Sequence, residues 1–217
     1  MRIIAGRLRH RKLLSNSGNT TRPIIDRAKV MLFDRIRDRL PNARVADLFC
    51  GTGTLGFESL SRGAQSVVFV ERDHRAYELL RQNMTALGVG EQALCWRVDL
   101  ARCSLLPKGD RVWAPYDIVF FDPPYVAATQ LDAGGDWHRC LLRLSRPALT
   151  SEQALLVLRT PREAEFALPA MWQTEHVIDI ASMKITLAVK NEGAGDALGS
   201  APSILRDDAE SGDLTDD

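Results

Sequence analysis

The stretch Val45–Gly56 reads V-A-D-L-F-C-G-T-G-T-L-G and decides the fold class. Its apolar beginning predicts a strand over Arg44–Phe49, and the glycines at 51, 53 and 56 form a G-x-G-x-x-G pattern that opens a helix over Thr54–Ser61. Glu71 stands twenty residues after the first glycine, at the end of the next apolar run. A strand, a glycine turn, a helix and an acid at this spacing are typical of a Rossmann-like fold that holds a nucleotide-like ligand.

Strands and helices alternate along the rest of the chain. We expect helices over Asp26–Leu40, Asp73–Leu87 and Asp136–Arg146, and strands over Arg2–Ala5, Lys12–Leu14, Ser66–Val70, Ala93–Val98, Tyr116–Phe121, Ala154–Leu158, Val177–Ile180 and Lys184–Val189. Strands separated by helices of this length predict an α/β doubly wound sheet, mostly parallel with an antiparallel C-terminal strand. The two short strands before residue 15 would form a small N-terminal β extension.

Charge is distributed unevenly along the 217 residues, although the formal net charge is zero. Residues 1–39 hold eleven Lys and Arg against three acids, a net of +8, whereas residues 191–217 hold eight acids against one arginine, a net of −7. We interpret residues 1–20 as a basic extension, 21–190 as the α/β domain and 191–217 as an acidic disordered tail. The basic end favours a polyanionic partner such as RNA, with a solvated basic surface as the alternative.

Composition excludes several classes of protein. No apolar run approaches the ~18 residues of a membrane span, and the basic first residues lack the apolar core of a secretory signal. An organellar transit peptide is the alternative for that arginine-rich start. The four cysteines form no C-x-x-C pair and no zinc-ligand spacing with histidine, which indicates reduced thiols in a cytoplasmic protein without a metal.

Asp47 distinguishes between the ligands that a glycine turn can hold. It stands near the end of its strand, where a dinucleotide would bring its pyrophosphate, and a carboxylate there repels phosphate. S-adenosylmethionine has no phosphate and carries a sulfonium and an ammonium, so it fits better. Glu71 would accept hydrogen bonds from the ribose hydroxyls and Asp99 from the adenine amino group. The alternatives are a helix-capping role for Asp47 and an ordinary acid after a strand for Asp99.

The motif Asp122-Pro123-Pro124-Tyr125 directly follows an expected strand. Two prolines fix two φ angles and remove two N–H donors, which leaves a rigid turn with free carbonyl acceptors. Asp122 and a loop carbonyl can accept the two N–H bonds of an exocyclic amine, and Tyr125 can stack on the ring that bears it. A turn that merely ends a strand is the alternative, but the preceding motifs favour a methyl-transfer site.

Together these motifs resemble the RsmD family of class I S-adenosylmethionine-dependent methyltransferases. The resemblance covers about residues 1–190. It rests on M-R-I-I-A-G-R-L-R-H-R-K-L (1–13), T-R-P-I-I-D-R-A-K-V-M-L-F-D (21–34), D-L-F-C-G-T-G-T-L-G-F-E-S-L-S-R-G-A (47–64), V-F-V-E-R-D (68–73) and F-D-P-P-Y (121–125). It implies methylation of N2 of a guanine in 16S ribosomal RNA, guanine 966, during small-subunit assembly. The turn Ala181–Lys184 and the acidic tail depart from the family pattern.

The resemblance also implies which residues form the site. Cofactor contacts are expected from Asp47, Phe49, Gly51, Thr52, Gly53, Glu71, Arg72 and Asp99, and catalysis from Asp122, Pro123, Pro124 and Tyr125. The resemblance also implies a role near the methyl-transfer site for Thr21, Arg22 and Pro23. The charge of the basic extension, rather than the resemblance, predicts RNA contacts from Arg7, Arg9, Arg11 and Lys12. We expect a monomer that acts on 16S ribosomal RNA within a small-subunit particle, with no membrane or metal partner.

Three other functions remain as alternatives. Methylation of another amine, adenine N6 or a protein glutamine, is less favoured because such enzymes usually carry Asn at the position of Asp122. An NAD-dependent oxidoreductase is disfavoured by Asp47 and by the absence of a plausible hydride-site His or Tyr-x-x-x-Lys. A non-catalytic RNA-binding module would keep the basic extension but would not need an intact D-P-P-Y motif.

Overall fold

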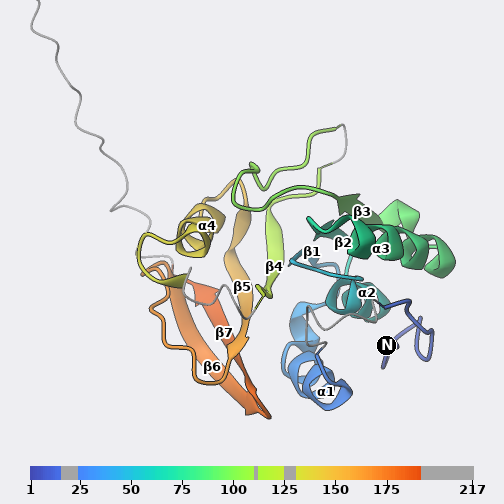
Figure 1. The fold of residues 1–217 in the computed structure, drawn as a ribbon, viewed down its shortest axis with the longest axis horizontal. Coiled ribbons are helices and arrows are strands. Elements are labelled where there is room, and N and C mark those ends of the chain that lie inside the picture. The colour runs from blue at the N-terminus through green and yellow to red at the C-terminus, as the bar shows by residue number, and fades with distance from the viewer. Residues whose placement is uncertain (16–23, 110–111, 125–130, 192–217) are drawn as a thin grey trace, which may run out of the picture.

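The computed structural model describes residues 1–15, 24–109, 112–124 and 131–191, and these form a seven-stranded sheet with the order β3-β2-β1-β4-β5-β7-β6 (Figure 1). The strands are β1 (Arg44–Leu48), β2 (Ser66–Val70), β3 (Ala93–Trp96), β4 (Tyr116–Phe121), β5 (Thr150–Pro161), β6 (Trp172–Ile180) and β7 (Met183–Lys190). Neighbours from β3 to β5 pair in parallel, whereas β7 runs antiparallel to both β5 and β6. The predicted mostly parallel, doubly wound sheet is therefore confirmed.

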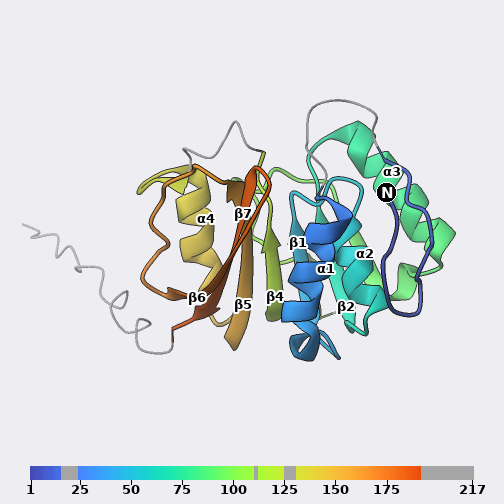
Figure 2. The same cartoon turned by 90° about the horizontal axis from the view of Figure 1, so that it is seen from below.

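Helices cover both faces of the sheet (Figures 1 and 2). They are α1 (Asp26–Arg35), α2 (Thr54–Ser61), α3 (His74–Leu87) and α4 (Asp136–Leu144). The residues of β4 show the two faces: Ile118 and Phe120 belong to the core cluster that includes α1–α3, whereas Val119 and Phe121 belong to the cluster that includes α4. This alternation follows from the two-residue period of a strand, and it buries β4 on both sides.

Several element boundaries differ from the sequence-based expectation. Helix α1 ends at Arg35, and a 3-10 turn over Arg37–Arg39 follows it. Asp26 does not cap this helix, because Ile25 occupies the cap position and Asp26 pairs with Arg2 and Lys29 instead. The strand expected over Ala154–Leu158 is longer at both ends, since β7 continues to pair with it as far as position 161.

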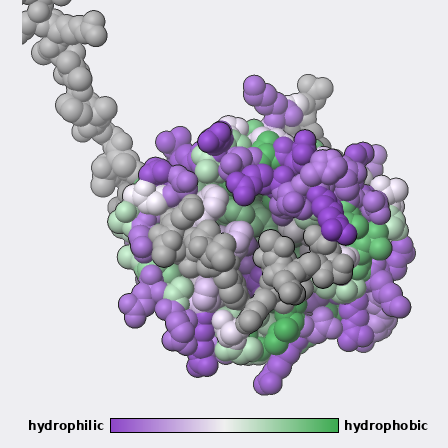
Figure 3. Space-filling model, in the orientation of Figure 1, coloured by the Kyte–Doolittle hydropathy of each residue, from purple (hydrophilic) through white to green (hydrophobic). Residues whose placement is uncertain are grey.

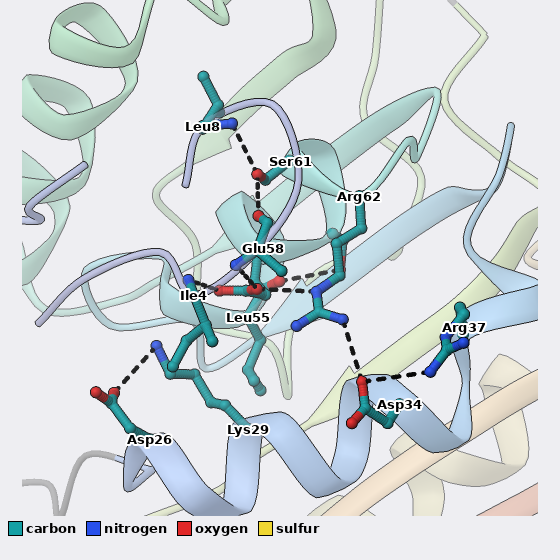
Figure 4. A network of polar contacts seen from close by, with 12 residues as sticks. Ile4, Leu8, Asp26, Lys29, Asp34, Arg37, Leu55, Glu58, Ser61 and Arg62 are labelled. Carbon is teal, nitrogen blue, oxygen red and sulfur yellow. Dashed lines mark hydrogen bonds and ion pairs between the residues drawn. The ribbon is translucent and has the colours of Figure 1, made fainter. Parts of the chain in front are cut away.

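The N-terminal β extension is reduced to a single antiparallel bridge between Arg2 and Lys12, but the segment is packed closely against α2. Glu58 of α2 is 0% exposed, and its carboxylate accepts the backbone N–H groups of Ile4 (2.8 Å) and Ala5 (3.0 Å) (Figure 4). Arg62 pairs with the same carboxylate at 2.9 Å, so the buried charge is neutralised. The basic extension is thus anchored on α2, the helix that follows residues 49–53, which we call the glycine loop.

Polar residues cover most of the described surface on the face seen in Figure 3, with apolar residues in small patches. Within the described ranges, few large apolar side chains remain exposed, namely Met1, Leu14, Ile25, Val30, Met31, Leu106, Val112 and Val177. Among the described residues, no helix combines the length and apolar character that crossing a membrane would require.

Candidate active site at the carboxyl edge of the sheet

The glycine loop joins β1 to α2 through three residues in the left-handed region. These are Phe49 (φ 62°), Gly51 (φ 57°) and Gly53 (φ 88°). A Cβ atom at Gly53 would lie 2.5 Å from the ring of Phe57, so only glycine fits there. A Cβ at Gly51 would meet no atom within 4 Å. The loop is therefore closely packed against Phe57 at Gly53. At Gly51 it is open, so a ligand can approach the backbone there.

Asp47 lies beneath this loop and is 1% exposed. Its Oδ2 accepts the backbone N–H of Gly56 at 2.8 Å, in the first turn of α2, which is the helix-capping role weighed as an alternative. Burial raises the pKa of Asp47 to about 8, and the nearby carboxylates of Asp122 and Glu71 contribute in the same direction. A cationic ligand group would stabilise the charged form of this carboxyl.

Glu71 follows β2 and holds the glycine loop from the other side. Its Oε2 accepts the N–H of Gly51 at 2.9 Å, and its Oε1 accepts the N–H of Asp73 at 2.7 Å. Each carboxylate oxygen has a second lone pair, so these bonds leave room for ribose hydroxyls. Asp99, beyond β3, is ion-paired with exposed Arg72 at 3.5 Å, so the structure brings two more of the expected cofactor residues together.

The D-P-P-Y motif begins beside the glycine loop because β4 is the neighbour of β1. Phe121 pairs with Leu48, and the N–H of Asp122 donates to the carbonyl oxygen of Leu48 at 3.4 Å. Pro123 is buried and Pro124 is half-buried. Tyr125 lies outside the described residues, as do Thr21, Arg22, Pro23 and the acidic tail beyond residue 191. The described part of the motif thus lies at the same edge of the sheet as the glycine loop.

An aromatic cluster, which sequence reasoning missed, joins the two loops. The ring of Phe49 lies 4.7 Å from that of Trp137 in α4 and 5.2 Å from that of Phe121, in both cases edge to face. Such contacts add about 0.5–1.5 kcal/mol each beyond the area that they bury. Phe49 therefore packs its side chain against the last residue of β4, directly before Asp122.

Asn83 of α3 also contacts the glycine loop, and the sequence did not indicate this role. Its Nδ2 donates to the carbonyl oxygens of Leu14 (3.0 Å) and Thr52 (3.1 Å), and its Oδ1 accepts the N–H of Leu14 at 2.8 Å. The side chain is 2% exposed, so these bonds satisfy a buried amide. Asn83 connects the end of the basic extension to the glycine loop.

The four basic residues expected to contact RNA fall into two pairs. Arg7 donates to the carbonyl oxygen of Leu60 and to the side chain of Gln92, and Arg11 donates to the carbonyl oxygen of Ala86. Arg9 and Lys12 are exposed, and within the described ranges their side chains have no hydrogen-bond or ion-pair partner. Arg7 and Arg11 therefore fasten the extension to the domain, whereas the other pair faces solvent.

The residues at this edge fit S-adenosylmethionine. The buried hydroxyl of Thr52 has no hydrogen-bond partner in the described structure, and Gly51 beside it exposes open backbone. Two carboxyls, those of Asp47 and Glu71, adjoin this loop, and carboxyls suit a ligand that carries cationic groups and ribose hydroxyls. Among the described residues no group of three or more His, Cys, Asp or Glu side chains is arranged to hold a metal ion, and the four cysteines are free thiols.

A family model described as "Conserved hypothetical protein 95" matches residues 1–185. The chain belongs to this family, the RsmD family that its motifs indicated. Two curated relatives carry the name "Ribosomal RNA small subunit methyltransferase D". The one from Haemophilus influenzae is 35% identical over 127 residues, and the one from Escherichia coli K12 is 34% identical over 125 residues. Each match covers 58% of this chain, and it spans 64% and 60% of those relatives' lengths.

Solved structures resemble the chain over more of its length. The structure of yhhF from Escherichia coli is 28% identical, with a TM-score of 0.73 over 88% of this chain and 98% of that one. An RNA methyltransferase from Salinibacter ruber, solved with S-adenosyl-L-homocysteine, is 15% identical, with a TM-score of 0.58 over 82% of this chain and 100% of that one. At that identity the likeness shows only the fold, which is the Rossmann-like methyltransferase fold predicted from the glycine loop.

Proposed function

We propose that this protein uses S-adenosylmethionine to methylate the exocyclic N2 amine of a guanine in 16S ribosomal RNA, with guanine 966 as the target, during small-subunit assembly. One observation carries the proposal: Asp122 follows β4 directly beside the glycine loop, with its N–H bonded to Leu48 at 3.4 Å. A rigid acceptor loop at this place suits an amine, whereas a dinucleotide or a metal would need different groups.

The family supports the same conclusion. The Haemophilus and Escherichia relatives are named as small-subunit ribosomal RNA methyltransferases, and the basic extension of this chain suits a polyanionic substrate. We place the protein in the cytoplasm as a monomer that acts on a small-subunit particle. Residues 1–20 would serve as the RNA-binding extension, 21–190 as the methyltransferase domain and 191–217 as a tail without a catalytic role.

The chain's part in the reaction is alignment. When bound, S-adenosylmethionine supplies a methyl group on a sulfonium, which is already a strong electrophile. Asp122 and the carbonyl of Pro123 would accept the two N–H bonds of the amine and direct its lone pair at the methyl carbon. Tyr125 would stack on the guanine ring. The amine proton becomes acidic only as the N–C bond forms, and it passes to the Asp122 carboxylate or to water.

The test is to identify the methylated nucleoside. The protein is incubated with labelled S-adenosylmethionine and, in separate reactions, undermethylated small subunits, naked 16S RNA and large subunits. We expect N2-methylguanosine from the small-subunit reaction. N6-methyladenosine or labelled protein would support the other amine substrates. No label in any reaction, with cofactor binding intact, would instead favour the non-catalytic RNA-binding module.

A further inference from the structure

A buried ion pair joins the D-P-P-Y aspartate to a strand outside the motif. Nε of Arg159 donates to Oδ1 of Asp122 at 2.6 Å, and the side chains are 9% and 15% exposed, respectively. Strands β4 and β5 are parallel neighbours (Figure 1). The two residues meet because Phe121 pairs with Leu158, and Asp122 and Arg159 are the next residues along the two strands. Charge-assisted bonds of this length are among the stronger polar contacts in proteins.

We infer that Arg159 is a positioning residue for methyl transfer, which holds Asp122 as a carboxylate with one oxygen fixed and Oδ2 presented to the substrate amine. This inference rests on the proposed function, in which Asp122 accepts an N–H bond of the amine. A carboxylate accepts at both oxygens, whereas a protonated carboxyl turns one of them into a donor. The orientation of the amine therefore depends on the charge state of Asp122.

The surroundings of Asp122 work against that charge. Burial raises the pKa of Asp122, and the guanidinium of Arg159 opposes this effect. Two further acids lie at the same edge, namely Asp47 on β1 and Glu71 after β2. Among the described residues, Arg159 is the cation in ion-pair contact with Asp122. Without Arg159, three carboxyls would share a poorly solvated edge of the sheet. The pKa of Asp122 would then be higher, so that its carboxyl would be protonated more readily.

The sheet does not need this pair to set its register. Strands β4 and β5 are already aligned by the pairing of residues 118–121 with residues 155–158, and Arg159 itself is paired with Ile185 of β7. A purely structural pair at this position would therefore be redundant. The geometry instead favours a pair that acts on the one carboxylate of the motif.

The experiment compares Arg159→Gln and Arg159→Lys with Arg44→Gln. Arg44 is a matched control, since it pairs with Asp117 near the other end of β4 at 3.2 Å. Single-turnover methyl transfer is measured at saturating cofactor and RNA over a range of pH. For Arg159→Gln we expect a rate about 10- to 100-fold lower at pH 7, the scale of a misplaced reacting group. The rate should recover as the pH is raised, because Asp122 then loses its proton.

The other variants and the binding constants separate positioning from folding. Arg159→Lys keeps the charge but loses the planar guanidinium, so its rate should fall less and its pH profile should stay near that of the wild type. Arg44→Gln should remain within about twofold of the wild type. Dissociation constants for cofactor and RNA should not change in any of them. An Arg159→Gln variant with the wild-type rate and pH profile would overturn the inference.

A second measurement does not depend on catalysis. The Asp122 carboxyl carbon is assigned by ¹³C NMR from its absence in Asp122→Asn, and it is titrated in the wild type and in Arg159→Gln. We expect a higher pKa for Asp122 in the variant, and equal values would overturn the inference. If the wild type methylates no RNA, the proposed function fails, while this titration still decides whether Arg159 sets the charge of Asp122. If Arg159→Gln does not fold, the same titration in Arg159→Lys should match the wild type, and a raised pKa there would contradict the inference.

Discussion

Strand β4 has an aspartate near each end, and each is paired with an arginine from a neighbouring strand. Near the amino end, Asp117 pairs with Arg44 of β1 at 3.2 Å, and the two side chains are 32% and 28% exposed. Just past the carboxyl end, Asp122 pairs with Arg159 of β5 at 2.6 Å, and the side chains are 15% and 9% exposed. The residue types are the same, but the depth of burial differs.

This difference in burial decides what each pair contributes. Water screens the Arg44–Asp117 pair, and such pairs contribute about 0–1 kcal/mol to the free energy of unfolding. The N–H of Arg44 also donates to Asp117, so this pair helps to align β1 with β4. The Arg159–Asp122 pair is desolvated, and removing one partner of such a pair costs about 3–5 kcal/mol because a buried charge is left alone. The first pair supports the sheet, and the second is the one that we propose holds Asp122 as a carboxylate for methyl transfer.

The largest expected effect comes from replacing the aspartates of the two β4 pairs one at a time. Asp122→Ala should lower kcat by roughly 10²–10⁴, the range typical of a positioned acid–base group, while cofactor affinity stays near that of the wild type. Asp117→Ala should leave kcat within about twofold and lower the melting temperature slightly. Single-turnover kinetics with thermal melting measures both. Near wild-type turnover by Asp122→Ala would show that the D-P-P-Y loop does not carry the reaction.

A second prediction extends the comparison along the carboxyl edge to β2. Glu71→Ala should weaken S-adenosylmethionine binding by about 1–3 kcal/mol, the scale for losing hydrogen bonds to a charged group. NAD should not compete for the site. Glu78 on α3 is the control, because this acid pairs with Arg81 on the helix surface, and Glu78→Ala should bind as the wild type does. Calorimetry that finds equal affinities in both variants would remove Glu71 from the cofactor site.

The carboxyl edge was also the part of the molecule that could best be predicted from sequence. Glu71 and Asp122 each come directly after a buried apolar run, and the ends of parallel strands meet at one edge, so their proximity follows from the pattern. The same rule applies to Arg159, which follows Leu158. It was overlooked because no motif surrounds it and the strand continues past it in the pairing with β7.

Other contacts could not be predicted, because they depend on how distant segments dock. Asn83 bonds to Leu14 across 69 positions, and Glu58 bonds to Ile4 across 54. No local spacing indicates either partner. Asp26, the first residue of the expected helix over Asp26–Leu40, is a related case: a cap by this acid is a natural expectation for a helix start, but its carboxylate pairs with Arg2, 24 positions away. Periodicity and turn chemistry thus predicted the sheet and its edge, but not the anchoring of the N-terminal segment.

A third prediction uses the raised pKa of Asp47, which burial brings to about 8. Between pH 6 and 8 the carboxyl is mostly protonated, and a bound cation favours its charged form, so cofactor binding should release a proton there. The affinity of the wild type should therefore rise with pH, by at most about tenfold per pH unit. Asp47→Asn keeps an oxygen for the N–H of Gly56 but cannot ionise.

The difference between these two proteins isolates Asp47, because any titration of the ligand is common to both. Calorimetry in two buffers of different ionisation enthalpy counts the protons released. A wild type and an Asp47→Asn variant with the same pH dependence would show that Asp47 acts only as the cap of α2.

The smallest expected effects lie in the basic extension, which is outside the sheet that holds the two β4 ion pairs. Basic residues occur there in two settings: Arg7 and Arg11 bond to α2, α3 and the turn before β3, whereas Arg9 and Lys12 face solvent. Arg9→Ala with Lys12→Ala should weaken RNA binding and reduce the slope of log K against log salt by up to ~0.7–0.9 for each phosphate that is no longer neutralised. Cofactor affinity and melting temperature should hardly change.

The complementary double variant, Arg7→Ala with Arg11→Ala, removes the same formal charge and provides the control. It should lower the melting temperature, because the bonds to Leu60, Gln92 and Ala86 are removed, and it should change the salt slope less. If the two double variants reduce the salt slope equally, all four residues contact phosphate when RNA is bound, and the hydrogen bonds of Arg7 and Arg11 must break on binding. If neither changes it, the extension is a solvated basic surface, and RNA is held by other residues.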